Sequence, residues 1–137
     1  MKLTRYTDYA LRVLMHLAVA PERLASIAEI AAAHGVSENH LMKVVQDLGR
    51  MGYLTNLRGR GGGVKLARGA GSITVGEVVR LTEGDCSLLD CEGCALSSRC
   101  RLTGVLAAAK RAFYATLDQC TIAEIAASPA TFSAMAE

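Results

Sequence analysis

The sequence predicts a mainly α-helical fold that carries one small two-stranded β-hairpin. Helix-capping motifs precede apolar residues at helical spacing, and a single glycine-rich stretch separates two short alternating segments. Hydrophobic residues make up 51% of the chain, while aromatic residues make up 4% and tryptophan is absent. Few aromatics argue against a β-sandwich. The 137 residues suit one domain, or a small domain with an appended dimerisation segment.

The first predicted helix begins at Asp8, with Thr7 as its N-cap. Apolar residues follow at helical spacing, and Pro21 lies just past the end. Asp8 falls in the first turn, where the helix dipole favours a carboxylate. That structural role is enough to explain Asp8 from the residues alone.

Two further helices are predicted to follow, joined by a tight turn. Residues 26–29 (Ser-Ile-Ala-Glu) form a capping box that opens a helix over about 27–34, which Gly35 ends. Ser37 then caps a helix that runs to about Met51, just before a glycine. Two helices joined in this way form a helix-turn-helix.

The second of these helices has two chemically different faces. Its apolar face predicts burial, and its polar face carries residue types suited to base edges and phosphates. An ordinary solvated helix face would look the same. The apolar face holds Leu41, Val44, Val45 and Leu48, and the polar face holds Asn39, Lys43, Gln46 and Arg50.

A basic hairpin is predicted next. Residues 53–57 and 64–67 alternate like strands, and Arg-Gly-Arg-Gly-Gly-Gly joins them at 58–63. Arg58 and Arg60 suit a narrow, negatively charged DNA minor groove. The loop lacks the Lys-Ser/Thr of a phosphate-binding P-loop, and no helix follows it. Helix, turn, helix and hairpin together predict a winged helix-turn-helix.

Double-stranded operator DNA is therefore the expected partner. Residues 1–81 hold eleven Lys and Arg against six Asp and Glu, whereas residues 82–137 hold four against seven. A basic N-terminal part suits a polyanion. The candidate DNA-binding residues are Asn39, His40, Lys43, Arg58 and Arg60, although His40 could equally serve hydrogen bonding at the helix start.

The C-terminal half continues with capped helices. Thr74 and Glu77 form a second capping box for a helix to about Thr82, and Thr121 and Glu124 form a third. Between them a long helix is predicted after Cys100. Its stripe has few elements to cover it, so a second copy is expected, giving a homodimer. The stripe is Leu102, Val105, Leu106, Ala109, Phe113 and Leu117. The expected organisation is a DNA-binding domain over 1–83, a cysteine-rich loop over 84–100, and a dimerisation helix with tail over 101–137.

Four of the five cysteines fall in one polar segment, 86–100. Thiolates select zinc, copper(I) or iron–sulfur clusters, and polar neighbours do not build a core. Cys86, Cys91 and Cys94 have the spacing of plant-type ferredoxin ligands, so Cys86 is one candidate ligand. Zinc would suit the same thiols. Cys120 lies outside the loop and is interpreted as a core residue or a spare thiol.

Location and enzyme class also follow from the residues. No apolar run approaches the ~18 residues of a membrane helix, and the N-terminus lacks the apolar core of a signal peptide. A cytoplasmic protein without a membrane partner is expected, with reduced thiols rather than disulfides. No grouping of catalytic Ser, His and Asp is evident, so we do not expect an enzyme.

Three stretches together resemble a known family. They are residues 1–12, the wing loop 58–63, and Cys94-(five residues)-Cys100-Arg-Leu. The chain resembles, over nearly its whole length, the iron–sulfur winged-helix repressors typified by NsrR and IscR, and is most similar to the nitric-oxide-sensing NsrR branch. The IscR branch has a histidine ligand after its third cysteine, and nothing at residues 101–103 matches it.

This resemblance implies a [4Fe-4S] cluster, with [2Fe-2S] or zinc as alternatives. The matching ligand positions are Cys91, Cys94 and Cys100 of one subunit and Asp8 of the other. It also implies a repressor that releases DNA when nitric oxide destroys the cluster, although redox or iron sensing would use the same parts. One departure is that the family usually has more residues between the first two cysteines. Cys86 therefore remains an alternative to Asp8.

Overall fold

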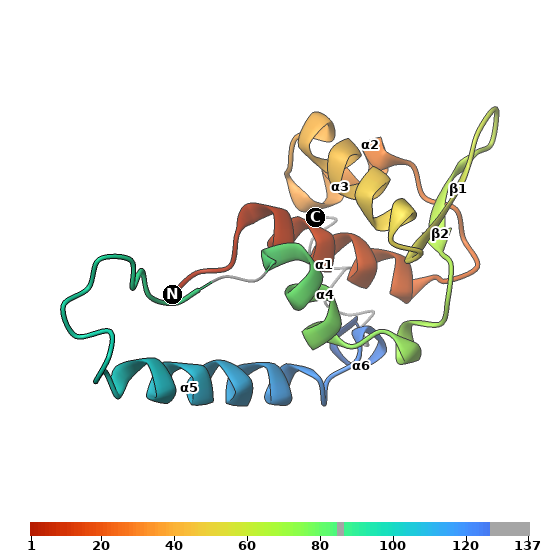
Figure 1. Cartoon of the computed structure of the whole chain (residues 1–137). Coiled ribbons are helices and arrows are strands. Elements are labelled where there is room, and N and C mark those ends of the chain that lie inside the picture. Colours follow the sequence, from red (N-terminus) through yellow and green to blue (C-terminus); the bar gives the residue numbers. More distant parts are fainter. Residues whose placement is uncertain (85–86, 127–137) are drawn as a thin grey trace.

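The computed structural model describes residues 1–84 and 87–126. It is mainly helical with one two-stranded antiparallel sheet, as the sequence predicts (Figure 1). None of the described helices combines the length and the hydropathy needed to cross a membrane. In chain order the elements are α1 (Arg5–Val19), α2 (Ile27–His34), α3 (Glu38–Arg50), β1 (Leu54–Leu57), β2 (Gly63–Leu66), η1 (Ala70–Ser72), α4 (Val75–Glu83), α5 (Leu102–Leu117) and α6 (Ile122–Ala126).

Helix α1 runs through the middle of the molecule and packs against α2, α3, α4 and α6. Its inner face is fully buried at Ala10, Val13 and Leu14. The predicted start at Asp8 is wrong. The helix begins at Arg5, and Thr4 is its N-cap, accepting the Thr7 N–H at Oγ1 over 3.2 Å.

The helix-turn-helix is confirmed. Gly35 ends α2 with φ of 62°, a left-handed conformation that favours glycine, and its N–H reaches the Ala31 and Ala32 carbonyls. Ser26 caps α2 by accepting the Glu29 N–H at 3.1 Å. The Glu29 carboxylate accepts from Arg23, so the predicted reciprocal bond gives way to an ion pair.

The wing projects from the body (Figure 1). Its strands pair in register from Leu54 opposite Leu66 to Leu57 opposite Gly63. An isolated bridge joins the wing base to the segment before α2, because Val64 N–H donates to the Ala25 carbonyl at 2.8 Å. A Cβ on Gly63 would lie 2.7 Å from that carbonyl oxygen, so only glycine fits there.

Backbone pairing brings the C-terminal segment back to the core beside α4. Both predicted capping boxes are confirmed, at Thr74 and Glu77 and at Thr121 and Glu124. Ile122 N–H donates to the Ile73 carbonyl at 2.8 Å, and Ile122 is fully buried. This return places α6 on α1.

Helix α5 lies alongside the body rather than inside it (Figure 1). No residue of α5 is buried, and Leu102 and Val105 are 51% and 63% exposed. Its C-terminal end is fastened to α4, because Arg80 donates to Asp118 at 2.8 Å and its guanidinium lies 4.6 Å from the centre of the Tyr114 ring. Phe113 and Leu117 pack against the core, whereas Leu102 and Val105 at the start of the predicted apolar stripe have little cover among the described residues.

Candidate nucleic-acid interface and metal centre

Helix α3 separates its two faces as its sequence pattern requires. Leu41, Val44, Val45 and Leu48 are buried against the core. Asn39, His40 and Lys43 are exposed. Because the apolar face fixes the helix on the body, the polar face stands free at its N-terminal half. This is the part of a recognition helix that contacts base edges in helix-turn-helix proteins.

A hollow of about 360 Å³ lies between the start of α1 and this face. Arg5 and Tyr9 line it together with the three predicted residues of α3. Arg5 therefore extends the basic surface beyond the recognition helix. The structure brings Arg5 beside the predicted DNA-binding residues of α3.

A second hollow, of about 440 Å³, lies between the end of α3 and the wing. Gln46, Arg50, Asn56 and Arg58 line it. Asn56 was missed from the sequence, because its place depends on how β1 packs beside Gly49; its amide nitrogen would be 3.1 Å from a Cβ there. The hollow presents two cations and two amides, which suits a phosphodiester.

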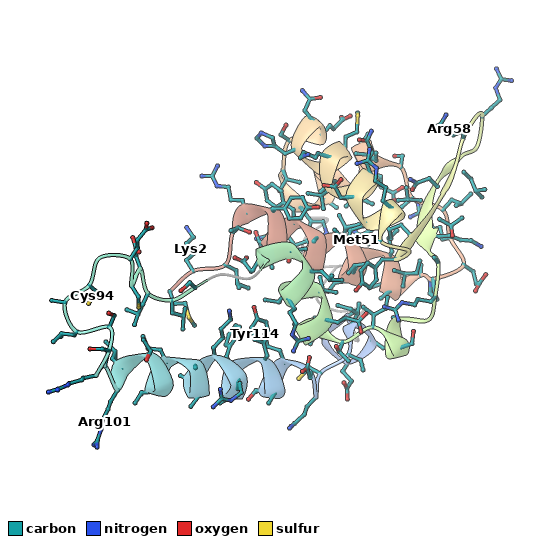
Figure 2. The ribbon with its side chains drawn as sticks, in the orientation of Figure 1. Lys2, Met51, Arg58, Cys94, Arg101 and Tyr114 are labelled. Atoms are coloured by element: carbon teal, nitrogen blue, oxygen red, sulfur yellow. The ribbon has the colours of Figure 1, made fainter. Side chains whose placement is uncertain are left out.

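Arg58 and Arg60 are both exposed at the wing tip. Arg58 lies on the wing beside the hollow at the end of α3, and Cys94 lies at the opposite end of the molecule (Figure 2). The wing and the cysteine loop are therefore far apart in the same chain. Any influence of one on the other has to pass through the body.

The cysteine loop is built from successive turns. Cys94 N–H donates to the Cys91 carbonyl at 3.2 Å, and Gly93 between them has φ of 72°. A positive φ at this position is characteristic of a type II turn and favours glycine. The Asp90 carboxylate accepts the Glu92 N–H at 3.1 Å. Cys91 and Cys94 consequently stand at the two ends of one turn.

The three predicted thiol ligands are free, with Cys91 and Cys94 exposed and Cys100 half-buried. Within residues 1–84 and 87–126, no three His, Cys, Asp or Glu side chains are gathered closely enough to hold a metal. The structure thus places Cys91 and Cys94 at the two ends of one turn but does not bring them together with Cys100 and Asp8. Cys86 lies outside the described residues. Three accessible thiols on one polar loop are nonetheless a donor set that fits a soft metal centre.

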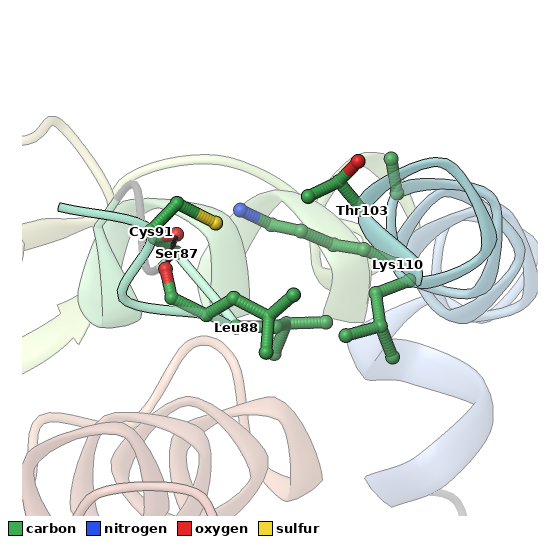
Figure 3. A pocket seen from close by; sticks show the side chains of 8 residues that line it. Ser87, Leu88, Cys91, Thr103 and Lys110 are labelled. Atoms are coloured by element: carbon green, nitrogen blue, oxygen red, sulfur yellow. Dashed lines mark hydrogen bonds between the residues drawn. The ribbon is translucent and has the colours of Figure 1, made fainter. Parts of the chain in front are cut away.

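A pocket of about 310 Å³ separates this loop from α5. The Cys91 thiol and the Lys110 amine point toward one another across it (Figure 3). Leu88 and Leu106 contribute an apolar wall. Lys110 was missed from the sequence, because only the packing of α5 beside the loop brings it there. Its ammonium places a positive charge near the thiols.

Asp8 lies on α1, where Arg12 Nε donates to its Oδ1 at 3.0 Å. It lines a hollow of about 600 Å³ that Lys2, Arg5 and His34 also line. The predicted helix-terminal role is confirmed in part, because Asp8 is in the first turn of α1. Its surroundings are basic, which suits a segment carrying acidic residues or thiolates.

Curated relatives carry a consistent description. The chain is 45% identical over 131 residues to the HTH-type transcriptional regulator NsrR of Bacillus subtilis, covering 91% of this chain and 90% of that protein. The regulator of the same name from Geobacillus kaustophilus is also 45% identical, with 91% and 89% covered. These relatives are transcriptional regulators and not enzymes.

Solved structures share the fold. One is the T. potens IscR, with a TM-score of 0.76 at 26% identity, covering 91% of this chain and 85% of that one. Another is CymR, described as the global cysteine regulator of B. subtilis, with a TM-score of 0.71 at 27% identity, covering 92% and 96%. Residues 3–128 match the family model Rrf2, described as an iron-dependent transcriptional regulator. The chain is therefore a transcriptional regulator and belongs to the Rrf2 family.

Proposed function

We propose that this regulator is a homodimeric repressor that binds operator DNA while it holds a [4Fe-4S] cluster. It releases the DNA in response to nitric oxide. The observation that carries the proposal is the pairing of an exposed reading helix and wing with three free thiols on one loop. The name of the 45%-identical relatives supports the nitric-oxide-sensing branch. The protein would act in the cytoplasm, where its DNA is, without a membrane.

The dimer is supported by the exposed stripe of α5. Leu102 and Val105 are more than half exposed on a helix that has no buried residue. Covering these side chains with the same helix of a second copy removes apolar surface from water. A two-fold dimer also places two reading helices for palindromic half-sites.

The cluster would be held by Cys91, Cys94 and Cys100, with Asp8 of the partner subunit as the fourth ligand. The basic hollow around Asp8 favours the approach of the acidic, thiol-bearing loop. When bound, the cluster supplies iron with which nitric oxide reacts.

The residues of the chain convert this chemistry into a change of DNA affinity. Asp8 in ligation joins one subunit's α1 to the other subunit's loop. Once that ligation ends, Asp8 retains only its ion pair with Arg12, and the spacing of the two recognition helices is no longer fixed across the dimer. Lys43, Arg58 and Arg60 supply the non-specific attraction to phosphates.

Anaerobic purification tests the proposal. We expect a coloured protein that contains iron and sulfide, and Cys91→Ala, Cys94→Ala or Cys100→Ala should abolish the colour. Cys120→Ala is the matched control and should keep it. Colourless protein that contains zinc would instead establish the zinc-structured alternative.

A second experiment decides the fourth ligand and the signal. Asp8→Ala and Cys86→Ala are compared, and the variant that keeps the cluster intact excludes its residue as a ligand. Titration of the cluster-loaded protein with nitric oxide should then release a bound operator duplex. Release by peroxide or by iron depletion, with no response to nitric oxide, would identify redox or iron sensing.

A further inference from the structure

The start of α1 is held by a side chain from the end of α4. The Glu83 carboxylate accepts hydrogen bonds at Oε1 from the Thr4 N–H at 2.8 Å and from the Thr4 hydroxyl at 2.9 Å. The Thr7 hydroxyl donates to the same oxygen. The first N–H groups of a helix lack partners within the helix, and its dipole favours an anion there. Glu83 is thus a cap for α1 supplied from a distant part of the chain.

This contact is charged and partly open to solvent, because Thr4 is exposed and Glu83 is half-buried. Thr7 is 0% exposed and is the buried polar residue of the described core. Burial opposes ionisation of Glu83, but the hydrogen bonds from Thr7 and Thr4 outweigh it and lower its pKa below the usual value of 4.5. The carboxylate is therefore ionised at neutral pH. Hydrogen bonds to an ionised acceptor are about twice as strong as neutral ones.

Glu83 is also the last helical residue before the cysteine loop. Gly84 ends α4 with φ of 69°, a conformation that favours glycine and lets the chain leave the helix abruptly. The loop therefore departs from a point that Glu83 fastens to α1.

The same first turn of α1 is fastened to the recognition helix on another side. The Tyr6 hydroxyl donates to Asp47 Oδ2 of α3 at 2.7 Å. Burial, and then the hydrogen bond with Asp47, raise the pKa of Tyr6 to about 12, so the phenol keeps its proton at neutral pH. Arg50 approaches the other oxygen of Asp47 at 3.4 Å.

We propose that Glu83 is a positioning residue that transmits the state of the cysteine loop to the recognition helix of the same subunit. The path runs from Glu83 through Thr4 and Thr7 to the first turn of α1, and from Tyr6 to Asp47. The inference rests on the proposed function and adds to the cross-subunit ligand a second connection inside each chain. It also accounts for how a loop at one end of the molecule reaches a reading surface at the other (Figure 2).

The test compares DNA affinity with and without the cluster. The probe is a duplex selected from a random-sequence library by the cluster-loaded wild-type protein. The ratio of the cluster-free Kd to the cluster-loaded Kd measures the coupling, which in regulated proteins typically spans about 5–150-fold. Glu83→Gln should keep the cluster's absorption spectrum but lower this ratio at least about fivefold. Tyr6→Phe should lower it similarly, and the double variant should go no lower, because both residues lie on one path.

Matched variants separate positioning from general stability. Glu22→Gln removes a carboxylate from the exposed loop after α1 and should leave the ratio unchanged. Thr7→Val removes the buried hydroxyl and should lower the ratio, whereas Thr7→Ser keeps the hydroxyl and should preserve it. A Glu83→Gln protein with the full ratio, or a Thr7→Ser protein as impaired as Thr7→Val, would overturn the inference.

Hydrogen exchange on the wild-type protein avoids the risk that a variant does not fold. Amide protection in the first turn of α1 and around Asp47 should fall when the cluster is removed, and unchanged protection there would overturn the inference. A wild-type protein that binds the selected duplex equally with and without its cluster would overturn the proposed function itself. A large wild-type ratio that Glu83→Gln retains would overturn only the role of Glu83.

Discussion

Replacing Arg58 by glutamine removes one cation from the tip of each wing. Arg58 is exposed and lines the hollow between α3 and the wing, outside the buried core, so the substitution leaves the core untouched. Each cation that neutralises a DNA phosphate contributes about −0.9 to the slope of log affinity against log salt concentration. A dimer loses two, so the slope should become shallower by about 1.8. The ratio of wild-type to Arg58→Gln affinity for DNA should therefore fall about twelvefold between 50 and 200 mM salt.

Fluorescence anisotropy of a labelled duplex across that salt range gives the slope directly. Arg101→Gln is the matched control, because it changes the charge equally at the end of the molecule away from the wing (Figure 2). Its slope should equal that of the wild-type protein. An unchanged slope for Arg58→Gln, or an equal decrease for Arg101→Gln, would refute the assignment of the wing tip to DNA.

Three further predictions concern stability. The rings of His16 and His34 meet edge to face, with their centroids 5.3 Å apart. Burial is the main cause that lowers the pKa of each below 6.5. A lowered pKa favours the neutral folded state, so this contribution is complete above pH 6.5 and is lost as pH falls below it. The urea midpoint of the wild-type protein should be lower at pH 5.5 than at pH 7.5, and this decrease should be smaller in the His16→Gln, His34→Gln double variant. An equal decrease in the two proteins would contradict this reasoning. Leu48→Ala empties a fully buried position of α3 and should cost about 2–5 kcal/mol by urea unfolding, whereas a loss under ~1 kcal/mol would show that the site collapses. Gly76→Ala should lower the melting temperature, because a Cβ there would overlap the Asp118 carboxylate and lie 2.9 Å from the Asp118 nitrogen; a stable variant would show that the end of α5 moves freely.

Local patterns in the sequence predicted most contacts between residues close in the chain; the exception is Glu29, which pairs with Arg23 instead of completing its capping box. The Thr74 and Thr121 capping boxes are confirmed, because each hydroxyl and its glutamate are three residues apart. The start of α1 was misplaced for the opposite reason. Thr7 has the chemistry of an N-cap, but its hydroxyl is turned to Glu83, 76 residues away. Nothing in the local sequence reports that contact.

The residues of the candidate site also fall into those set by local sequence and those set by packing between distant elements. The buried and exposed faces of α3 follow from side-chain periodicity, so Asn39 and Lys43 were predictable. Asn56 and Lys110 were not, because packing of β1 beside α3 and of α5 beside the loop brings them to their hollows. The cysteines were identified by type and spacing, whereas in the proposed function their assembly would depend on a bound metal and a second chain. Their role therefore stays a prediction.

The uncovered state of α5 has a consequence for protein concentration. Helices in proteins owe most of their stability to packing against other elements, and α5 has 16 residues with none buried. In the proposed dimer, most of its order would come from association, which is second order in chain concentration. Dilution should therefore unwind α5 and loosen the loop that ends at Cys100, so the number of copies in a cell would set how much of the regulator can hold its metal.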